Sequence, residues 1–567
     1  MTKIISKYLA YLFFICTLLP FCNGHEFKTD FHIFLQGDLS EETAKGLSAG
    51  KPYPCPPVRV KADDNFVDFS KWNDGKFKYR QPGILLARID ADKDGLRYIG
   101  IGADWYFSCY LNGEAVYLPP SGNLLPVARE NYQIPVKVKA GKNLFAIRVQ
   151  AGSKGWGTYC TLSQGPDVKL PHPPWLVKSD IGTATVNFIT SSPMSAFLEY
   201  RPAGSTQWKR LKNATAGLLR QTKLHSFELK DLQEDTVYEF RAVLAPDRHF
   251  GYEYNSSIYT FRSLGKNNQK FRIFLTGDTQ VSRSDRIKVF QDFKKNTPLD
   301  SCDAFIHLGD ADNFIGNAED LFFNSILDIV QANRKSLPHL VMVRGNHEYL
   351  GKDALTFIDY FCGKDGKTHY SFRQGKVFFI VLDNGCDHAY EVRKNHAFYA
   401  YLDDENIHAE QQEFLKRTVR SKDFQEAEFR IVISHSPGIN PCRMTDSLKK
   451  ICEGVFPGDP VKNKIHLWIS GHTHKYCRTV NKNTTAQRAF TTEGLLRYTA
   501  IPNTIHLVND GPFAGNGLDI SAILMEFTPG KIEVKAFDPA GKVFDHFNID
   551  ANGELKEIHT NLQVFGL

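Results

Sequence analysis

Five short apolar runs in the C-terminal half of the chain each end directly on polar residues of the kinds that bind metal ions. These ends are Gly277-Asp278-Thr279-Gln280, Gly309-Asp310-Ala311-Asp312-Asn313, Arg344-Gly345-Asn346-His347-Glu348, Ser434-His435 and Gly471-His472-Thr473-His474. Longer helix-compatible segments, such as 285–295 and 317–334, lie between the runs. Strands that alternate with helices predict an α/β domain with largely buried strands. In such folds the carboxyl ends of the strands share one edge of the sheet, where ligands bind.

The residue types at these ends favour a pair of metal ions. Carboxylate, imidazole and amide oxygen together suit zinc, manganese or iron, with no thiolate required. Glycine beside a ligand permits a tight turn and a close approach of the backbone. Two ions about 3.5–4 Å apart need a bridging ligand, and a carboxylate has the two oxygens for it. One Gly-Asp or one His-x-His alone is usually a turn or a surface pair, but five such ends in one domain predict a site.

The N-terminus has the features of an export signal. Lys3 and Lys7 precede an apolar stretch at 8–21 that is too short to span a bilayer, and small residues near Gly24 would allow cleavage. We therefore expect a signal peptide at 1–24 and a secreted, periplasmic or cell-surface mature chain without a transmembrane span. An uncleaved membrane anchor and a lipid anchor at Cys22 are the two alternatives.

Residues 25–168 alternate between apolar and polar positions with the period of β-strands, which predicts a jelly-roll-like β-sandwich. Asn112-Gly113 between apolar flanks marks a tight hairpin, because both turn positions tolerate positive φ. Trp72, Trp105 and Trp156 either fill the core of this sandwich, which we favour, or form a platform that contacts a glycan.

Residues 169–266 predict a second, smaller β-sandwich, and the α/β domain occupies 267–567. The proline-rich stretch at 171–175 is expected to be an extended linker. The second sandwich is similar to a fibronectin type III domain or to the N-terminal domain of purple acid phosphatases. There the hydroxyl of Tyr238 would cap the backbone at a turn.

The order Gly-Asp, Gly-Asp, Gly-Asn-His-Glu, His and Gly-His-x-His resembles that of the calcineurin-like metallophosphoesterase superfamily, over about residues 270–545. The preceding sandwich, the export signal and the strand pair expected at 369–383 look most like the purple acid phosphatase branch. The resemblance implies a double β-sandwich flanked by helices. It also implies hydrolysis of phosphate monoesters by attack of a metal-bound hydroxide, with two di- or trivalent ions of iron, zinc or manganese.

The same resemblance assigns ligands to the two ions. The first ion would take Asp278, Asp310 and His474, and the second would take Asp310, Asn346, His435 and His472. Asp310 would therefore be the bridge.

Two residues of the third motif carry a catalytic expectation. His347 would act as general acid or stabilise the leaving oxygen. Glu348 either orients the imidazole of His347 or is a solvent-exposed acid of the loop.

The sequence departs from the family pattern at two positions. Asn313 stands where purple members have a tyrosine ligand, so we expect no purple colour. We also expect Asn313 to contact the substrate. Gln280 stands where other members have a histidine, and its amide oxygen is a weaker metal ligand. Arg344 either helps to hold phosphate or pairs with a carboxylate. His408 falls in a polar stretch that predicts a solvated loop.

Two other functions compete with a monoesterase. A phosphodiesterase or nucleotide pyrophosphatase of the same superfamily would use the same ligands. A surface glycan-binding protein with a degenerate esterase domain would explain the departures at Asn313 and Gln280. A net charge of +6 over 567 residues, with both signs interspersed, gives no nucleic-acid-binding patch.

Overall fold

The computed structural model describes residues 30–118, 127–246, 253–386, 402–440, 446–455, 465–508 and 520–560, apart from residues 54, 63, 164, 166, 475, 480–485, 492–493 and 501–504. The expected signal peptide at 1–24 lies outside the described residues. The chain divides into two compact units, Met1–Asp167 with Ala245–Tyr252, and Val168–Leu244 with Glu253–Leu567. Among the described helices, none combines the length and the apolar character needed to cross a membrane.

The first unit contains two antiparallel sheets that enclose one apolar core, which confirms the predicted sandwich. One sheet has the order β2 (Val58–Lys61), β1 (Asp30–Phe34), β4 (Pro82–Ala91), β9 (Gly141–Gln150), β6 (Phe107–Leu111) and β7 (Glu114–Tyr117). The other has the order β3 (Phe66–Asp68), β10 (Gly157–Ser163), β5 (Gly95–Ala103) and β8 (Tyr132–Val138). A short helix η1 (Phe69–Trp72) follows β3, and α2 (Glu41–Ser48) is capped by Ser40, whose hydroxyl accepts from the Thr43 amide at 3.2 Å.

Local sequence signals in this sandwich have the expected outcome. Asn112 and Gly113 join β6 to β7 with φ of +50° and +86°, which confirms the hairpin. Trp156 is buried and stacks on Phe69 at 5.2 Å between ring centroids, whereas Trp72 remains 46% exposed. Core packing therefore explains Trp156 and does not explain Trp72.

The second unit is built on two large sheets and a two-stranded hairpin. The 14-stranded sheet runs β18 (Tyr254–Asn255), β17 (Val237–Ala245), β12 (Thr183–Pro202), β11 (Trp175–Asp180), β22 (His339–Met342), β21 (Ala304–His307), β20 (Phe271–Thr276), β32 (Ala522–Thr528), β33 (Lys531–Phe537), β34 (Val543–Asp550) and β35 (Leu555–Thr560), with β13 (Lys209–Lys212), β16 (Thr222–Leu229) and β19 (Tyr259–Arg262) off this path. The 9-stranded sheet runs β23 (Tyr370–Gln374), β24 (Val377–Val381), β25 (Phe429–Ile433), β27 (Leu467–Ser470), β31 (Ile505–Val508), β28 (Cys477–Thr479), β29 (Ala486–Thr491), β30 (Gly494–Ala500) and β26 (Ile439–Asn440). The hairpin is β14 (Ala214–Thr215) with β15 (Leu218–Leu219).

Helices cover the outer faces of the two large sheets, and an apolar layer lies between the sheets. On β20, Ile273 points into the layer between the sheets and Phe274 points to the helices, as strand alternation requires. On β24, Phe379 points inward and Phe378 packs on the outer helices. This arrangement confirms the predicted double sandwich flanked by helices.

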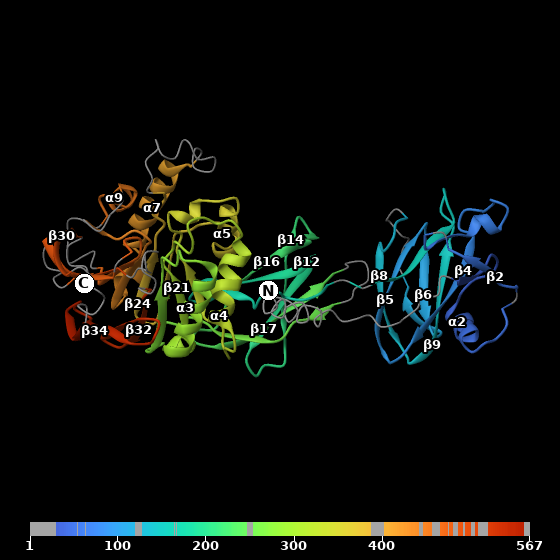
Figure 1. Cartoon of the computed structure of the whole chain (residues 1–567), viewed down its shortest axis with the longest axis horizontal. Helices are drawn as coiled ribbons and strands as arrows, with labels where there is room; N and C mark the ends of the chain where they lie inside the picture. The colour runs from blue at the N-terminus through green and yellow to red at the C-terminus, as the bar shows by residue number, and fades with distance from the viewer. Residues whose placement is uncertain are drawn as a thin grey trace, which may run out of the picture. The chain divides into compact units, whose positions relative to one another are not determined.

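The helices fall into two groups. The first sheet carries α3 (Arg283–Asn296), η2 (Pro298–Ser301), the π-helix η3 (Asp320–Leu327), α4 (Asp328–Gln331) and α5 (Ala354–Phe361). The second sheet carries α7 (Asp404–Thr418), α8 (Lys422–Glu426) and α9 (Asp446–Cys452). Helices α3 and α4 lie side by side in the yellow-green part of the ribbon (Figure 1).

The proline-rich stretch at 171–175, expected to be an extended linker, packs against other parts of the second unit. His172 is buried, with Nδ1 2.8 Å from an Asp328 oxygen and Nε2 3.2 Å from a Glu319 oxygen. Trp175 opens β11 and donates to the carbonyl of Tyr360 at 2.9 Å. Since β11 pairs in parallel with β22, the smaller sandwich continues directly into the sheet that carries β20, β21 and β22.

The smaller sandwich is held at one corner by Tyr238. Its hydroxyl accepts a hydrogen bond from the backbone amide of Gln233 at 2.8 Å, which confirms the predicted cap. Leu232 is buried beneath the same turn. The long strand β12 belongs to both layers, because its first part pairs with β16 and its second part with β13.

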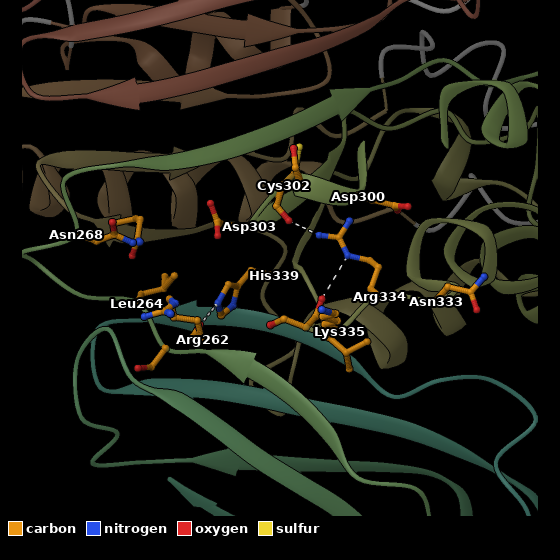
Figure 2. Close-up of a pocket in the computed structure, with 15 residues that line it drawn as sticks. Arg262, Leu264, Asn268, Asp300, Cys302, Asp303, Asn333, Arg334, Lys335 and His339 are labelled. Atoms are coloured by element: carbon orange, nitrogen blue, oxygen red, sulfur yellow. Dashed lines mark hydrogen bonds between the residues drawn. The ribbon is translucent and has the colours of Figure 1, made fainter. Parts of the chain in front are cut away.

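A polar cavity of about 350 Å³ lies at the amino ends of β21 and β22 (Figure 2). Asp303 directly precedes β21, and His339 is the first residue of β22. Arg334 crosses the wall of the cavity and donates to the carbonyl oxygens of Cys302 and, at 3.3 Å, of Ser336. The cavity is thus at the opposite edge of the sheet from the carboxyl ends of β20, β21 and β22, which three of the five polar motifs follow.

The core histidine His225 makes the stability of the second unit depend on pH. It lies on β16, fully buried, with its ring 5.2 Å from that of Phe188, and burial lowers its pKa to about 4. In the unfolded chain a histidine titrates near about 6.5. The unfolded state therefore binds more protons than the folded state between these two pH values. The contribution of His225 to the free energy of unfolding is greatest above pH 6.5 and falls as the pH drops from about 6.5 to about 4.

We predict that His225 contributes up to about 3 kcal/mol to this loss, from the shift between the two pKa values. Urea unfolding of the wild type and of His225→Phe between pH 7.5 and 4.5 measures it, since the phenyl ring cannot take up a proton. The wild type should lose stability more steeply than the variant. Parallel curves would show that His225 takes up a proton as readily in the folded state as in the unfolded chain, which would contradict the lowered pKa.

Candidate metal centre

The five apolar runs form strands of the two facing sheets, which confirms the strand prediction. Three of them, β20, β21 and β22, pair in parallel in the first sheet, and β25 and β27 pair in parallel in the second. The polar ends follow the carboxyl end of each strand, so the loops of both sheets gather at one rim.

A tight cluster of donor atoms surrounds Nε2 of His435. This atom lies 3.2 Å from Oδ2 of Asp310, 3.0 Å from Oδ1 of Asn346 and 3.3 Å from Nδ1 of His472. Asp310, His435 and His472 are all buried, and their donor atoms lie within 4.8 Å of one another. The structure therefore brings together the four residues that the family resemblance assigns to the second ion.

The chemistry of this cluster fits a cation. Nδ1 of His435 lies 2.9 Å from the carbonyl oxygen of Leu308 and donates to it, which leaves a lone pair on Nε2 of the neutral ring. The oxygens of Asp310 and Asn346 then face this lone pair, and positive charge among them makes the arrangement favourable. Fixing Nδ1 through a backbone carbonyl is how metal-bound histidines are usually oriented.

Protonation of His435 supplies that charge in the metal-free protein. Burial lowers the pKa of His435, but the adjacent Asp310 carboxylate more than offsets this and raises it to about 9. Burial likewise raises the pKa of Asp310, and the neighbouring His435 outweighs this and lowers it to about 2. A metal ion would replace this proton, so we expect metal binding to release it.

The residues assigned to the first ion lie next to this cluster. Nε2 of His474 is 3.6 Å from Oδ1 of Asp278. The backbone amide of His472 donates to both oxygens of Asp278, at 3.1 and 3.0 Å. The amide of Asp278 donates to the carbonyl of Gly309, next to Asp310, at 2.9 Å. These bonds fix the two groups of ligands relative to each other.

Four of the proposed ligands have a left-handed backbone. Asp278, Asp310, His472 and His474 have φ of +49°, +55°, +78° and +57°. This region costs a residue with a side chain about 1–3 kcal/mol, and such strain clusters at functional sites. Each turn thereby aims its side chain back over the end of its strand.

Two glycines allow the loops to approach closely. A Cβ on Gly309 would meet the amide nitrogen of Gly345 at 2.8 Å and Nδ1 of His435 at 2.9 Å. A Cβ on Gly345 would meet Oδ1 of Asp310 at 2.2 Å. A side chain at either position would push the ligands apart, which gives these glycines the close-approach role expected from the sequence.

His347 lies at the open side of the cluster. Its side chain is 25% exposed, its Nε2 is 3.8 Å from Oδ2 of Asp310, and its backbone amide donates to Oδ1 of Asp310 at 3.0 Å. Nδ1 lies 2.8 Å from the carbonyl oxygen of Asn313. Asn313 itself is exposed, and the contact that it makes with His347 is through its backbone carbonyl. Its expected contact with the substrate stays a prediction.

Glu348 is a buried tie between two loops, which excludes the solvent-exposed alternative. Its carboxylate accepts from the backbone amides of Gly345, Asp310 and Ala311, each at 2.8 Å. Burial and the neighbouring Asp310 raise the pKa of Glu348 to about 7, against the effect of these donors. The described contacts of its carboxylate hold the backbone of the Asp310 loop, and its expected contact with the His347 imidazole stays a prediction.

The structure places Gln280 within the cluster and Arg344 at its edge. Nε2 of Gln280 lies 3.2 Å from Oδ2 of Asp310, so the side chain reaches the centre. Arg344 forms a buried pair with Asp383 at 2.6 Å and stacks on Tyr349 at 3.8 Å from the ring centroid. These contacts agree with the second interpretation of Arg344, that it pairs with a carboxylate.

Two supporting residues were not identified from the sequence. Arg286 of α3 donates to the carbonyl of Thr279 at 3.0 Å and to Asp312 at 2.8 Å, and so ties the first loop to the second. It shares a buried helix face with Val289 and Phe290, and a charge on an apolar stripe is a usable signal. Asp383 follows an apolar run as the other motifs do, but no glycine or histidine beside it marks it as part of a site.

The C-terminal half of the chain is similar to proteins of a known family. Residues 271–476, roughly a third of the chain, match the family Calcineurin-like phosphoesterase, so this stretch is a calcineurin-like phosphoesterase domain. Among solved structures, the purple acid phosphatase PPD1 from yellow lupin (Lupinus luteus) seeds is similar at 16% identity and a TM-score of 0.47, over 83% of this chain and 93% of that one. PhoD is similar at 12% identity and a TM-score of 0.45, over 70% and 94%. No curated protein matches the sequence.

We predict that Asp310→Asn greatly reduces metal binding. The change removes one negative charge from the carboxylate that lies 3.2 Å from Nε2 of His435. The metal content measured after equilibration with zinc should fall from about two ions per chain, the number in a binuclear site, to well below one. Asp303→Asn, a carboxylate at the opposite edge of the sheet, is the control and should keep the wild-type content. A full complement of metal in Asp310→Asn would contradict its place as the bridge.

Proposed function

We propose that the calcineurin-like phosphoesterase domain of this chain is the catalytic domain of a secreted, binuclear metal-dependent phosphatase that hydrolyses phosphate monoesters. The observation that carries the proposal is the convergence of Asp310, Asn346, His435 and His472 around one point, with Asp278 and His474 beside them. This donor set has nitrogen and oxygen ligands only, which favours divalent zinc or manganese or iron.

When bound, the two cations lower the pKa of water and neutralise charge on the phosphoryl oxygens. The chain supplies the geometry for this chemistry. Asp278 and His474 would hold one ion, Asn346, His435 and His472 the other, and Asp310 both. The left-handed turns and the buried Glu348 keep these side chains in place before substrate arrives.

His347 is proposed to deliver a proton to the leaving group. Its Nδ1 faces a carbonyl oxygen, that of Asn313, so Nδ1 carries hydrogen and Nε2 is the atom that exchanges a proton with the substrate. The partial exposure of the ring is consistent with contact to a bound ester. General acids of this kind typically contribute about 10²–10⁴-fold to the rate.

The preference for monoesters rests on the resemblance to the purple acid phosphatase branch. A sandwich that precedes the catalytic domain and the strand pair β23–β24 before the fourth motif are the features in common. The exposed Asn313 at the tyrosine position supports a colourless, divalent centre. Secretion is proposed from the N-terminal sequence alone.

Turnover of p-nitrophenyl phosphate and of its bis-ester, with zinc, manganese and ferrous iron tried separately, tests the proposal. We expect the monoester to be the better substrate and activity to disappear on chelation. Faster turnover of the bis-ester would assign the domain to phosphodiesters. Less than one bound ion per chain and no hydrolysis of either ester would favour the glycan-binding alternative.

We predict that His347→Asn affects substrates according to their leaving group. An alkyl phosphate needs a proton on its departing oxygen, so its kcat/KM should fall about 10²–10⁴-fold. p-Nitrophenyl phosphate, whose phenolate leaves without a proton, should lose less than about tenfold. An equal loss on both substrates, with unchanged metal content, would assign His347 to phosphate binding and remove it as the acid.

A further inference from the structure

The turn after β24 lies beside the loop that carries His435. Strands β24 and β25 pair in parallel, with Val381 opposite Ile433, and the amide of Leu382 donates to the carbonyl of Ile433 at 2.9 Å. The next two residues, Asp383 and Asn384, therefore follow the carboxyl end of β24 at the rim on which the metal ligands gather. Both are buried.

The first residue of this turn is fixed from several sides. The backbone of Asp383 is bracketed by the side chain of Gln411, which accepts from its amide at 2.8 Å and donates to its carbonyl at 2.6 Å. The carboxylate of Asp383 accepts from Arg344 at 2.7 Å and from the hydroxyl of Tyr349 at 2.9 Å. The position of the turn is therefore determined by the chain itself, without a ligand.

The second residue of the turn, Asn384, presents an unused donor at the rim. Its Oδ1 accepts from the amide of Ser436, next to His435, at 2.8 Å. This bond also settles which end of the amide is oxygen, because a rotated side chain would set N–H against N–H. The remaining group, Nδ2, is buried and has no acceptor in the part of the chain that the structure describes. A buried donor of this kind costs stability and calls for an explanation.

We infer that Asn384 binds the phosphoryl group of the substrate through Nδ2. Phosphoryl oxygens are strong, negatively charged acceptors, and a fixed neutral donor at such a rim stabilises the charge they carry without becoming ionised itself. The Arg344–Asp383–Tyr349 cluster then acts as the support that places Asn384. This inference rests on the proposed phosphoesterase function and adds a substrate-binding residue to it.

The test uses the full-length, zinc-loaded protein with inorganic phosphate as the probe. In Asn384→Leu, a similar volume replaces the amide without adding charge. We expect calorimetry to show the Kd for phosphate raised about tenfold or more, as loss of a hydrogen bond to a charged group predicts. The kcat/KM should fall by a similar factor while metal content stays at the wild-type value.

Asn187→Leu is the matched control. Asn187 is a buried asparagine of the same unit whose Nδ2 donates to the carbonyl of Tyr360 at 2.9 Å, in the core between β12 and α5. Its replacement should lower stability and leave the phosphate Kd unchanged. Phosphate binding in Asn384→Leu within twofold of the wild type would overturn the inference, since an ordered water would then suffice as the acceptor.

A crystal structure of the wild type with zinc and phosphate decides the case if Asn384→Leu does not fold. A phosphate oxygen within hydrogen-bonding distance of Nδ2 supports the inference, and a water on Nδ2 with phosphate elsewhere overturns it. A zinc-loaded wild type that neither binds phosphate nor hydrolyses any phosphoester sinks the proposed function and the inference together, whereas normal wild-type behaviour with an unaffected variant sinks only the role of Asn384.

Discussion

The arrangement of lone pairs around Nε2 of His435 is the constraint on which the site depends. Asp310 and Asn346 direct acceptor oxygens, and His472 directs Nδ1, at this nitrogen, while Nδ1 of the same ring donates to Leu308 on the other side. The lone pairs of the two oxygens and of Nε2 repel one another unless positive charge lies among them. The protein holds these atoms together by strained turns and close glycine contacts. The fold thereby creates an electrostatic demand for positive charge, which a bound cation would supply.

This demand explains several features that would otherwise look wasteful. The left-handed backbone at four positions lowers the stability of the metal-free chain. The buried carboxylate of Glu348 binds three backbone amides without a gain in packing. Their common effect is to fix loops from two different sheets against each other. A rim built in this way is rigid before substrate binds, which is what a pre-organised charged site requires.

The sequence predicted the strands well because their apolar runs are short, continuous and bounded by glycine and polar residues. It also predicted α3 and the helical stretch 317–334, as longer helix-compatible segments between the runs, although the π-helical form of η3 has no visible signal. The polar segment around His408, expected to be a loop, includes α7, and His408 is buried on it. Its helix is mostly polar, and the few apolar residues that dock it, such as Leu415, are too sparse to reveal a period.

The candidate ligands could be predicted from residue type and order alone, without knowledge of contacts. The residues that hold these ligands in place could not be predicted, because the partners in each contact are distant in the sequence. The tie between Glu348 and the amides of Asp310 and Ala311 spans about forty residues, and nothing local marks a glutamate as the acceptor of three N–H groups. The packing of His172 against Asp328 is equally invisible, since a proline-rich stretch predicts an extended chain whether or not it is docked.

The parallel pairing of β11 with β22 has a consequence for how this protein is divided. A fragment cut to residues 271–476 would remove β11 from one side of the β20–β22 group and β32 from the other. Both flanks of that three-stranded group would then expose unpaired backbone, the condition under which sheets join edge to edge and aggregate. The smaller sandwich and the C-terminal strands therefore complete the sheet on which the phosphoesterase domain is built. The shortest fragment expected to stay monomeric begins before Trp175 and extends past β34.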